Sequence, residues 1–207
     1  MANNSQTQLS IANMTLAHLG MSEVANLESS SNDPKIKAIN RFWEPVRDDV
    51  FSELDWSFAT VTENLTQIDD YYAPEWSYGY EYTTLNVATF WYVFDQGTWN
   101  TKEEQKYEVK YDPNQGDKVI LTNLDDAIAE YTYIVTDPTL WSHKFIMAFT
   151  YRLASVLALP LLNDDEKATK MLTLSSAIVS EAKRIDSYNK IKIPTAHISK
   201  YRTARGA

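Results

Sequence analysis

Pairs of carboxylates near tryptophans are the side chains of this 207-residue chain best suited to chemistry. Adjacent acids occur at positions 69–70, 103–104, 125–126 and 164–165. A glycosidase needs two carboxyl groups across a sugar-binding cleft, and Trp76, Trp91 and Trp99 could line such a cleft. Adjacent acids on turns are more often solvated, and aromatic residues in strands are more often core. We therefore expect no catalytic residue, and a protein that is not an enzyme.

Metal and cofactor chemistry lack the residues they need. The three histidines, His18, His143 and His197, are far apart in the chain, and none has a second histidine or an acid three or four positions later. The chain has no cysteine, which excludes thiolate catalysis, disulfides and cysteine-ligated metals. Five glycines form no phosphate-binding motif. We expect no metal site and no cofactor.

The aromatic residues are concentrated in one region. Residues 71–111 contain 13 of the 26 aromatic side chains. Their density suggests a contact surface that includes Trp76, Trp91 and Trp99. One interpretation is a protein–protein surface, and the alternative is a carbohydrate-binding or glycan-degrading module in which these rings contact sugar.

Charge is also unevenly distributed. The chain has 28 acids and 19 bases, but residues 183–207 hold seven bases and the single acid Asp186. The acidic body argues against a protein that grips nucleic acid through its phosphates. We expect residues 190–207 to be an extended arm that docks on an acidic partner surface, and the alternative is a solvated chain end. The candidate partner-binding residues are Lys190, Lys192, Lys200, Tyr201, Arg202 and Arg205.

Two helices are predicted before the aromatic region. The first begins near Ser5, whose Ser-Gln-Thr-Gln sequence fits a capping box, and Gly20 ends it. The second has Asp33 as N-cap and Pro34 in its first turn, and its apolar stripe runs to about Leu54. Pro45 falls inside that stripe, so we expect a kink or two shorter helices there.

Strand patterns occupy residues 59–136. The clearest is a hairpin in which Tyr107, Val109 and Tyr111 alternate with polar residues before the turn at 112–116 and the apolar run 119–121. Further strands are predicted around 78–82, 89–94 and 131–135. The sequence therefore predicts an antiparallel β-domain.

Helical patterns return after this region. We expect one helix to begin at Asp137-Pro138 and to end at Pro160. Another is expected from 163–166, with its apolar face formed by Met171, Leu174, Ile178, Ala182 and Ile185. The apolar run 145–162 is long enough to be a membrane span, but Arg152 near its middle favours a buried helix and no membrane contact.

The fold class expected is α+β. A bundle of about four helices is formed by residues 1–58 and 137–189, with the antiparallel β-insert 59–136 between them and the extended basic arm 190–207 at the end. The apolar character of the helix over 145–160 raises the expectation of an oligomer.

Several segments in order resemble the tail tubular protein A family, the head-to-tail adaptors of short-tailed phages. An early helix ends in Leu19-Gly20, and a later one leads into Trp56-Ser-Phe-Ala59. The strongest similarity runs from the predicted hairpin into the following helix. Its segments are Tyr107-Glu-Val109, Ile120-Leu-Thr122, Tyr131 to Pro138, Phe145, Tyr151-Arg-Leu-Ala154 and Ala158-Leu-Pro160. The basic C-terminus, Lys200 to Arg205, is also similar, so the resemblance covers most of residues 9–205.

The resemblance implies a structural virion protein at the head-tail junction, assembled in the host cytoplasm. Family members form a ring, typically of twelve copies, between the portal protein and the tail nozzle. Double-stranded genomic DNA passes through the ring during ejection without specific binding. The acidic body is compatible with such a lumen, because negative walls repel phosphate and do not grip it.

Overall fold

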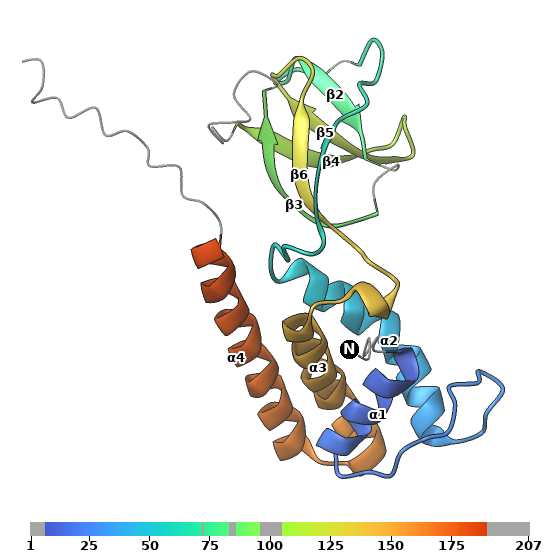
Figure 1. Cartoon of the computed structure of the whole chain (residues 1–207). Coiled ribbons are helices and arrows are strands. Elements are labelled where there is room, and N and C mark those ends of the chain that lie inside the picture. The colour runs from blue at the N-terminus through green and yellow to red at the C-terminus, as the bar shows by residue number, and fades with distance from the viewer. Residues whose placement is uncertain (1–6, 72, 83–85, 96–104, 190–207) are drawn as a thin grey trace, which may run out of the picture.

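The computed structural model describes residues 7–71, 73–82, 86–95 and 105–189 (Figure 1). Within these ranges the chain forms a helical unit and a β unit, which confirms the expected α+β class. The helices are α1 (Gln8–His18), α2 (Pro34–Ser52), the 3-10 helix η2 (Pro138–Leu140), α3 (His143–Leu162) and α4 (Asp165–Asn189). The strands are β1 (Thr60–Asn64), β2 (Tyr78–Glu81), β3 (Val87–Phe94), β4 (Tyr107–Asp112), β5 (Asp117–Thr122) and β6 (Ile128–Tyr133).

Helix α1 begins later than the sequence predicted. Thr7 is its N-cap, and the Thr7 hydroxyl oxygen accepts a hydrogen bond from the Ser10 N–H at 3.2 Å. The predicted start at Ser5 lies outside the described residues. At the other end, Gly20 has φ +73° and the Met21 N–H donates to the Leu16 carbonyl at 2.9 Å. Glycine adopts this left-handed conformation without strain, so the predicted end is correct.

Helix α2 is continuous, so of the two alternatives expected at Pro45, a kink or two shorter helices, the second was wrong. Asp33 caps it as predicted, with its carboxylate accepting from the Lys35 N–H at 2.8 Å. The helix then continues through Pro45 and ends at Ser52. Pro45 lies on the exposed side, where the Arg41 carbonyl that it leaves without a helical donor can be solvated. The buried side chains on the opposite side keep the helix together.

The boundaries of helix α3 differ from the prediction at both ends. Asp137-Pro138 starts only the 3-10 turn η2, because Trp141 is in an extended conformation with ψ 138°. Ser142 then caps α3, and its hydroxyl accepts from the Phe145 N–H at 3.3 Å. Pro160 does not end the helix, which stops where Asn163 turns left-handed at φ 51°. Pro160 is exposed and lies in the last turn, where a lost helical hydrogen bond costs little.

Helix α4 buries most of the predicted stripe, including Met171 and Ala182, but not Leu174. Leu174 is 37% exposed, whereas Ser175 is fully buried between Met171 and Ala182 in sequence. The Ser175 hydroxyl donates to the Ala148 carbonyl of α3 at 2.9 Å. Close approach of α4 to α3 therefore selects the small hydroxyl residue for the interface and turns the neighbouring leucine outward.

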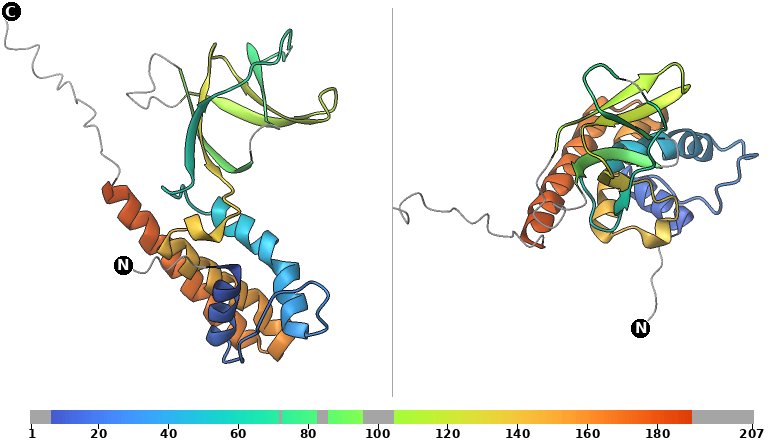
Figure 2. Two further views of the ribbon diagram at one scale, coloured as in Figure 1. Left: turned by 45° about the vertical axis from the view of Figure 1, so that its right-hand side comes forward. Right: turned by 90° about the horizontal axis from the view of Figure 1, so that it is seen from above.

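The core of the helical unit is built around α3, which contacts α1, α2 and α4. Figure 2 shows α4 along the outer side of α3, away from α1 and α2. Among the described helices only α3 is long and apolar enough to span a membrane, and more than half of it is buried. Arg152, in the middle of α3, pairs with Asp49 at 3.6 Å and with Glu53. These observations agree with a buried helix.

The β unit consists of two three-stranded antiparallel sheets, with strand orders β1-β6-β3 and β2-β5-β4. The predicted hairpin is β4–β5, in which Tyr107 pairs with Thr122 and Asp112 pairs with Asp117. The two sheets share one small core. Its buried members are Leu65, Tyr80, Val93, Ile120, Ala127, Ala129 and Tyr131.

The β unit sits at the end of the helical unit where α2 finishes (Figure 1). Contacts run from α2 to β3 and β6, and the Thr89 hydroxyl donates to the Ser52 carbonyl at 3.4 Å. The two units have separate apolar cores. The molecule is therefore elongated, with one unit at each end.

Candidate interaction surfaces

A groove on the β unit has a chemically varied lining. It has a volume of about 410 Å³ and lies between the loop before β2 and strand β4. We call it the Trp76 groove and define it by Tyr71, Trp76, Glu108, Lys110, Tyr111 and Asp112. It combines aromatic rings, carboxylates and one amine on an open surface.

One end of the groove is fixed by Asp112. Its carboxylate accepts the Asn114 N–H at 2.8 Å, which shapes the β4–β5 turn. It also accepts a hydrogen bond from the Tyr71 hydroxyl. The Asn114 N–H and then Tyr71 hold the pKa of Asp112 below its usual range. Burial, together with the Asp112 carboxylate, raises the pKa of Tyr71 to about 12. At neutral pH the site therefore holds a carboxylate and a protonated phenol.

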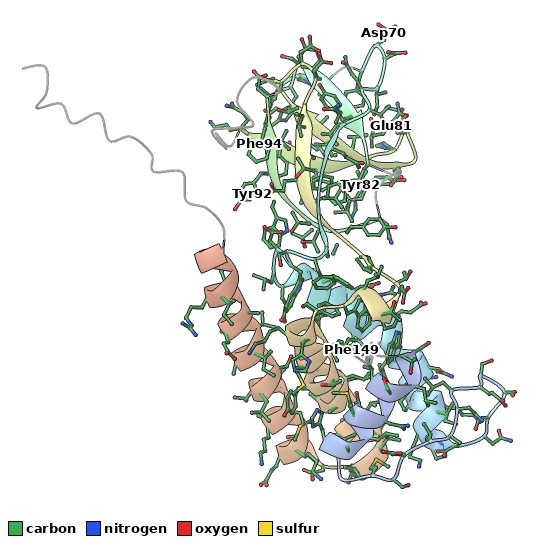
Figure 3. The ribbon with its side chains drawn as sticks, in the orientation of Figure 1. Asp70, Glu81, Tyr82, Tyr92, Phe94 and Phe149 are labelled. Atoms are coloured by element: carbon green, nitrogen blue, oxygen red, sulfur yellow. The ribbon has the colours of Figure 1, made fainter. Side chains whose placement is uncertain are left out.

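Gly79 of β2 allows this arrangement, because the Tyr71 ring lies directly on it. A Cβ at position 79 would be 2.6 Å from the Tyr71 Cγ atom, closer than real contacts allow. Figure 3 shows Asp70 at the tip of the loop that leads into this region, with Glu81 and Tyr82 on the same side of the β unit. Asp70 has φ 52°, a left-handed conformation that makes a tight turn in the chain immediately before Tyr71.

The other end of the groove is fixed by Trp76. Its indole Nε1–H donates to Glu108 Oε2 at 3.2 Å, and Lys110 Nζ lies 3.7 Å from Glu108 Oε1. Tyr111 is 63% exposed, so one face of its ring is open to a ligand. The aromatic pattern of the sequence indicated Trp76 but not its polar partners Glu108 and Lys110. The alternation of acidic, basic and aromatic residues along β4 was the available signal.

The three tryptophans predicted to share a surface do not do so where they are described. Trp76 lines the groove beside sheet β2-β5-β4. Trp91 is on β3 in the other sheet, and its indole N–H donates to the Thr132 hydroxyl at 2.7 Å, next to the end of α2. Trp99 lies outside the described residues. The six predicted arm residues, Lys190, Lys192, Lys200, Tyr201, Arg202 and Arg205, also lie outside them.

The described histidines are separated in space as well as in sequence. The His18 ring stacks on Tyr151, with centroids 4.1 Å apart, and its Nε2 lies 3.3 Å from the Thr150 hydroxyl. Burial lowers the pKa of His18. His143 is exposed at the start of α3. Over the described ranges no group of three histidines, cysteines or acids is placed to hold a metal ion.

Two of the adjacent acid pairs, 69–70 and 125–126, lie on turns. Asp70 and Asp126 both have positive φ, and Asp69, Asp125 and their partners are exposed. Residues 103–104 lie outside the described ranges. Asp164 instead caps α4, where its carboxylate accepts the Lys167 N–H at 2.8 Å, and Asp165 is the first residue of that helix. The pairs 69–70 and 125–126 therefore occupy solvated turn positions, as the sequence indicated.

A second exposed surface is apolar and lies on the helical unit. Leu159 near the end of α3 is 54% exposed, and Leu172 and Leu174 of α4 are 41% and 37% exposed. We call these three residues the outer leucines. Leu172 and Leu174 are two positions apart, so they flank the side of α4 that packs against α3. The far side of the helix carries the exposed polar residues Thr173, Ser176 and Ser180.

Comparison with protein-family models gives no match, and no curated protein sequence matches the chain either.

Proposed function

We propose that this protein is a structural head-to-tail adaptor of a short-tailed phage, present in the virion at the head-tail junction. In this proposal copies of the chain form a ring, expected to contain twelve, after assembly in the host cytoplasm. The portal protein binds on one side of the ring and the tail nozzle on the other. The sequence resemblance to the tail tubular protein A family motivates the proposal.

The observation that carries the proposal is the apolar area that the helical unit leaves exposed. The outer leucines, one on α3 and two on α4, add apolar area that the monomer does not bury. Exposed apolar area of this kind favours association, at roughly 25 cal/mol for each Å² removed from water. A contact between α4 and a different face of the next copy is heterologous, and heterologous contacts close into rings when the rotation allows.

The elongated shape supports the adaptor role. The helical unit and the β unit have separate cores at the two ends of the molecule, so each can bind a different partner. Residues 1–182 carry 27 acids and 12 bases. A ring built from such bodies has a negative lumen, and DNA can slide through it because phosphate is repelled.

The carbohydrate alternative is less well supported in its original form. It relied on Trp76, Trp91 and Trp99 acting on one surface, but Trp76 and Trp91 belong to different sheets. Of these two tryptophans, only Trp76 lines the Trp76 groove. The adaptor proposal needs no such joint surface.

Electron microscopy of the purified protein, with and without its portal, tests the proposal. We expect closed rings, and we expect them to bind the portal. The double variant Leu172→Glu with Leu174→Glu should give monomers, because it places charge on the contact surface. Leu140→Glu is the matched control, since Leu140 is 65% exposed on η2 away from α4. Monomers that ignore the portal in the unmodified protein would refute the proposal.

A further inference from the structure

We infer that the Trp76 groove of one copy binds the basic segment 190–207 of the neighbouring copy in the ring. This inference rests on the ring proposed above, and it names a contact that the ring by itself does not require. It assigns a peptide ligand to a cavity whose carboxylates and aromatic rings the adaptor proposal leaves unused.

The lining of the groove suits a cationic peptide. Glu75, Glu108 and Asp112 face it with only Lys110 as a counter-charge. The Lys110–Glu108 pair is exposed on both sides, and exposed pairs of this kind contribute at most about 1 kcal/mol. An incoming guanidinium or ammonium can therefore replace Lys110 at Glu108. The Tyr111 ring, open to solvent, offers its face for a cation–π contact.

The occupant is identified by its sequence. Residues 190–207 contain five bases and no acid. Apolar residues alternate with these bases, as they do in peptides that place side chains in successive pockets. They are Ile191, Ile193, Pro194, Ile198 and Tyr201. The apolar walls of the groove include Pro74, Pro113 and Leu121, which match that mixture of charge and apolar surface.

Position favours a neighbouring copy over the same copy. Figure 1 shows the end of α4, after which the segment begins, on one side of the molecule and the β4–β5 turn beside the groove on the other. Both views in Figure 2 agree with this separation. A segment of 18 residues can extend at most about 60 Å, which is enough to reach an adjacent copy. A head-to-tail ring requires the two contacting surfaces of each copy to lie on different sides of the molecule. The start of the segment and the Trp76 groove meet this requirement.

Cross-linking of single cysteines tests the contact in the full chain. The chain has no cysteine, so each introduced thiol is unique. One variant carries Tyr111→Cys and the other carries Lys200→Cys with a mass label, and the two are mixed and oxidised. We expect a disulfide between the two variants at a yield roughly tenfold above the control, because docking raises the effective concentration of the thiols. The control replaces Tyr111→Cys by Glu28→Cys, an exposed site on the helical unit.

A charge exchange supplies a second readout that does not depend on oxidation geometry. In this test the labelled copy carries Ser199→Cys. Adding Lys200→Glu and Arg202→Glu to that copy should lower its disulfide yield with the Tyr111→Cys copy roughly tenfold. Glu75→Lys with Glu108→Lys in the receiving copy should restore it. A glucose hexasaccharide added to the mixture should leave the yield unchanged.

The outcomes separate this inference from the adaptor proposal. Rings that form without a 111–200 linkage above control would overturn the groove assignment and leave the ring intact. A chain carrying both cysteines that links only within itself would overturn the assignment to a neighbour. Loss of the linkage on adding the hexasaccharide would assign the groove to glycan instead. Absence of rings together with absence of linkage would overturn both proposals.

Discussion

The helical unit and the β unit both bury aromatic residues, but they hold them by different interactions. In the helical unit the rings pack on one another: Phe149 lies 4.7 Å from Trp43 and 5.2 Å from Trp141 between ring centroids. In the β unit Phe94 is buried too, but two of the buried rings are tyrosines with hydroxyl groups on polar partners. Tyr80 donates to the Leu124 carbonyl at 2.7 Å, and Tyr131 donates to Glu63 at 2.7 Å.

This difference follows from the size of the two cores. The helical unit has enough apolar side chains to surround its rings on all sides. The β unit has a small core between two short sheets, so the far end of a large ring reaches its edge. A hydroxyl at that end finds a hydrogen-bond partner, whereas a phenylalanine would leave the partner unsatisfied. The helical unit therefore depends on packing, and the β unit depends more on specific hydrogen bonds.

The largest effect is expected from Phe149→Ala in the helical unit. The Phe149 side chain is fully buried, and its loss leaves a cavity in the ring cluster. The free energy of unfolding should fall by about 3 to 5 kcal/mol. Guanidinium unfolding followed by near-ultraviolet circular dichroism measures it. Leu140→Ala, at a site 65% exposed, is the control, and equal losses in the two variants would contradict the packing explanation.

A smaller loss is expected from Gly79→Ala in the β unit. The added methyl group displaces the Tyr71 ring and breaks its hydrogen bond to Asp112. The free energy of unfolding should fall by roughly 1 to 3 kcal/mol, and the pKa of Tyr71 should move from about 12 toward 10. Ultraviolet titration of the tyrosines measures that pKa shift.

The same substitution in a Tyr71→Ala background is its control. With the ring absent there is nothing for the methyl group to displace, so little further loss of stability is expected. An undiminished loss in that background would show that Tyr71 is not the residue that requires glycine at position 79.

Tyr80→Phe tests the hydrogen-bond side of the comparison. Removing the hydroxyl leaves the Leu124 carbonyl without its donor, which should cost about 1 kcal/mol. Hydrogen exchange should show the loss of protection in β2, β5 and β6 and not in α3. Tyr111→Phe, at an exposed site, should change nothing measurable. Equal stability of the Tyr80→Phe protein would contradict the role given to the buried hydroxyls.

The smallest effect concerns the pH dependence of the helical unit. The pKa of His18 is lowered in the folded state, so below pH 6.5 the unfolded chain binds a proton that the folded chain excludes. Stability present above pH 6.5 is therefore lost as the pH falls toward the folded-state pKa. His18→Gln should reduce the difference between urea midpoints at pH 7.5 and pH 5.5. An unchanged difference would mean that other groups cause it.

The sequence was sufficient to predict an element or its end where the structure depends only on neighbouring residues. Asp33-Pro34 and Gly20 marked helix ends, because capping and left-handed φ depend on neighbouring residues only. Alternation in β4 and the turn after it predicted the hairpin for the same reason. The candidate site was predicted only through Trp76, since Tyr71 and Asp112 are brought together across 41 positions by the pairing of β2 and β5.

Tertiary structure decided what depends on surroundings. Pro45 and Pro160 remain within helices because both lie on exposed sides, while buried residues elsewhere on the same helices hold them in place. Ser175 faces α3 in place of Leu174 because the backbones approach too closely for a larger side chain and offer the Ala148 carbonyl as a partner. The separation of Trp76 from Trp91 likewise follows from their placement in different sheets. Local patterns determined the helix ends at Asp33 and Gly20 and the β4–β5 turn, whereas packing decided the ends of α3 and which faces of the elements meet.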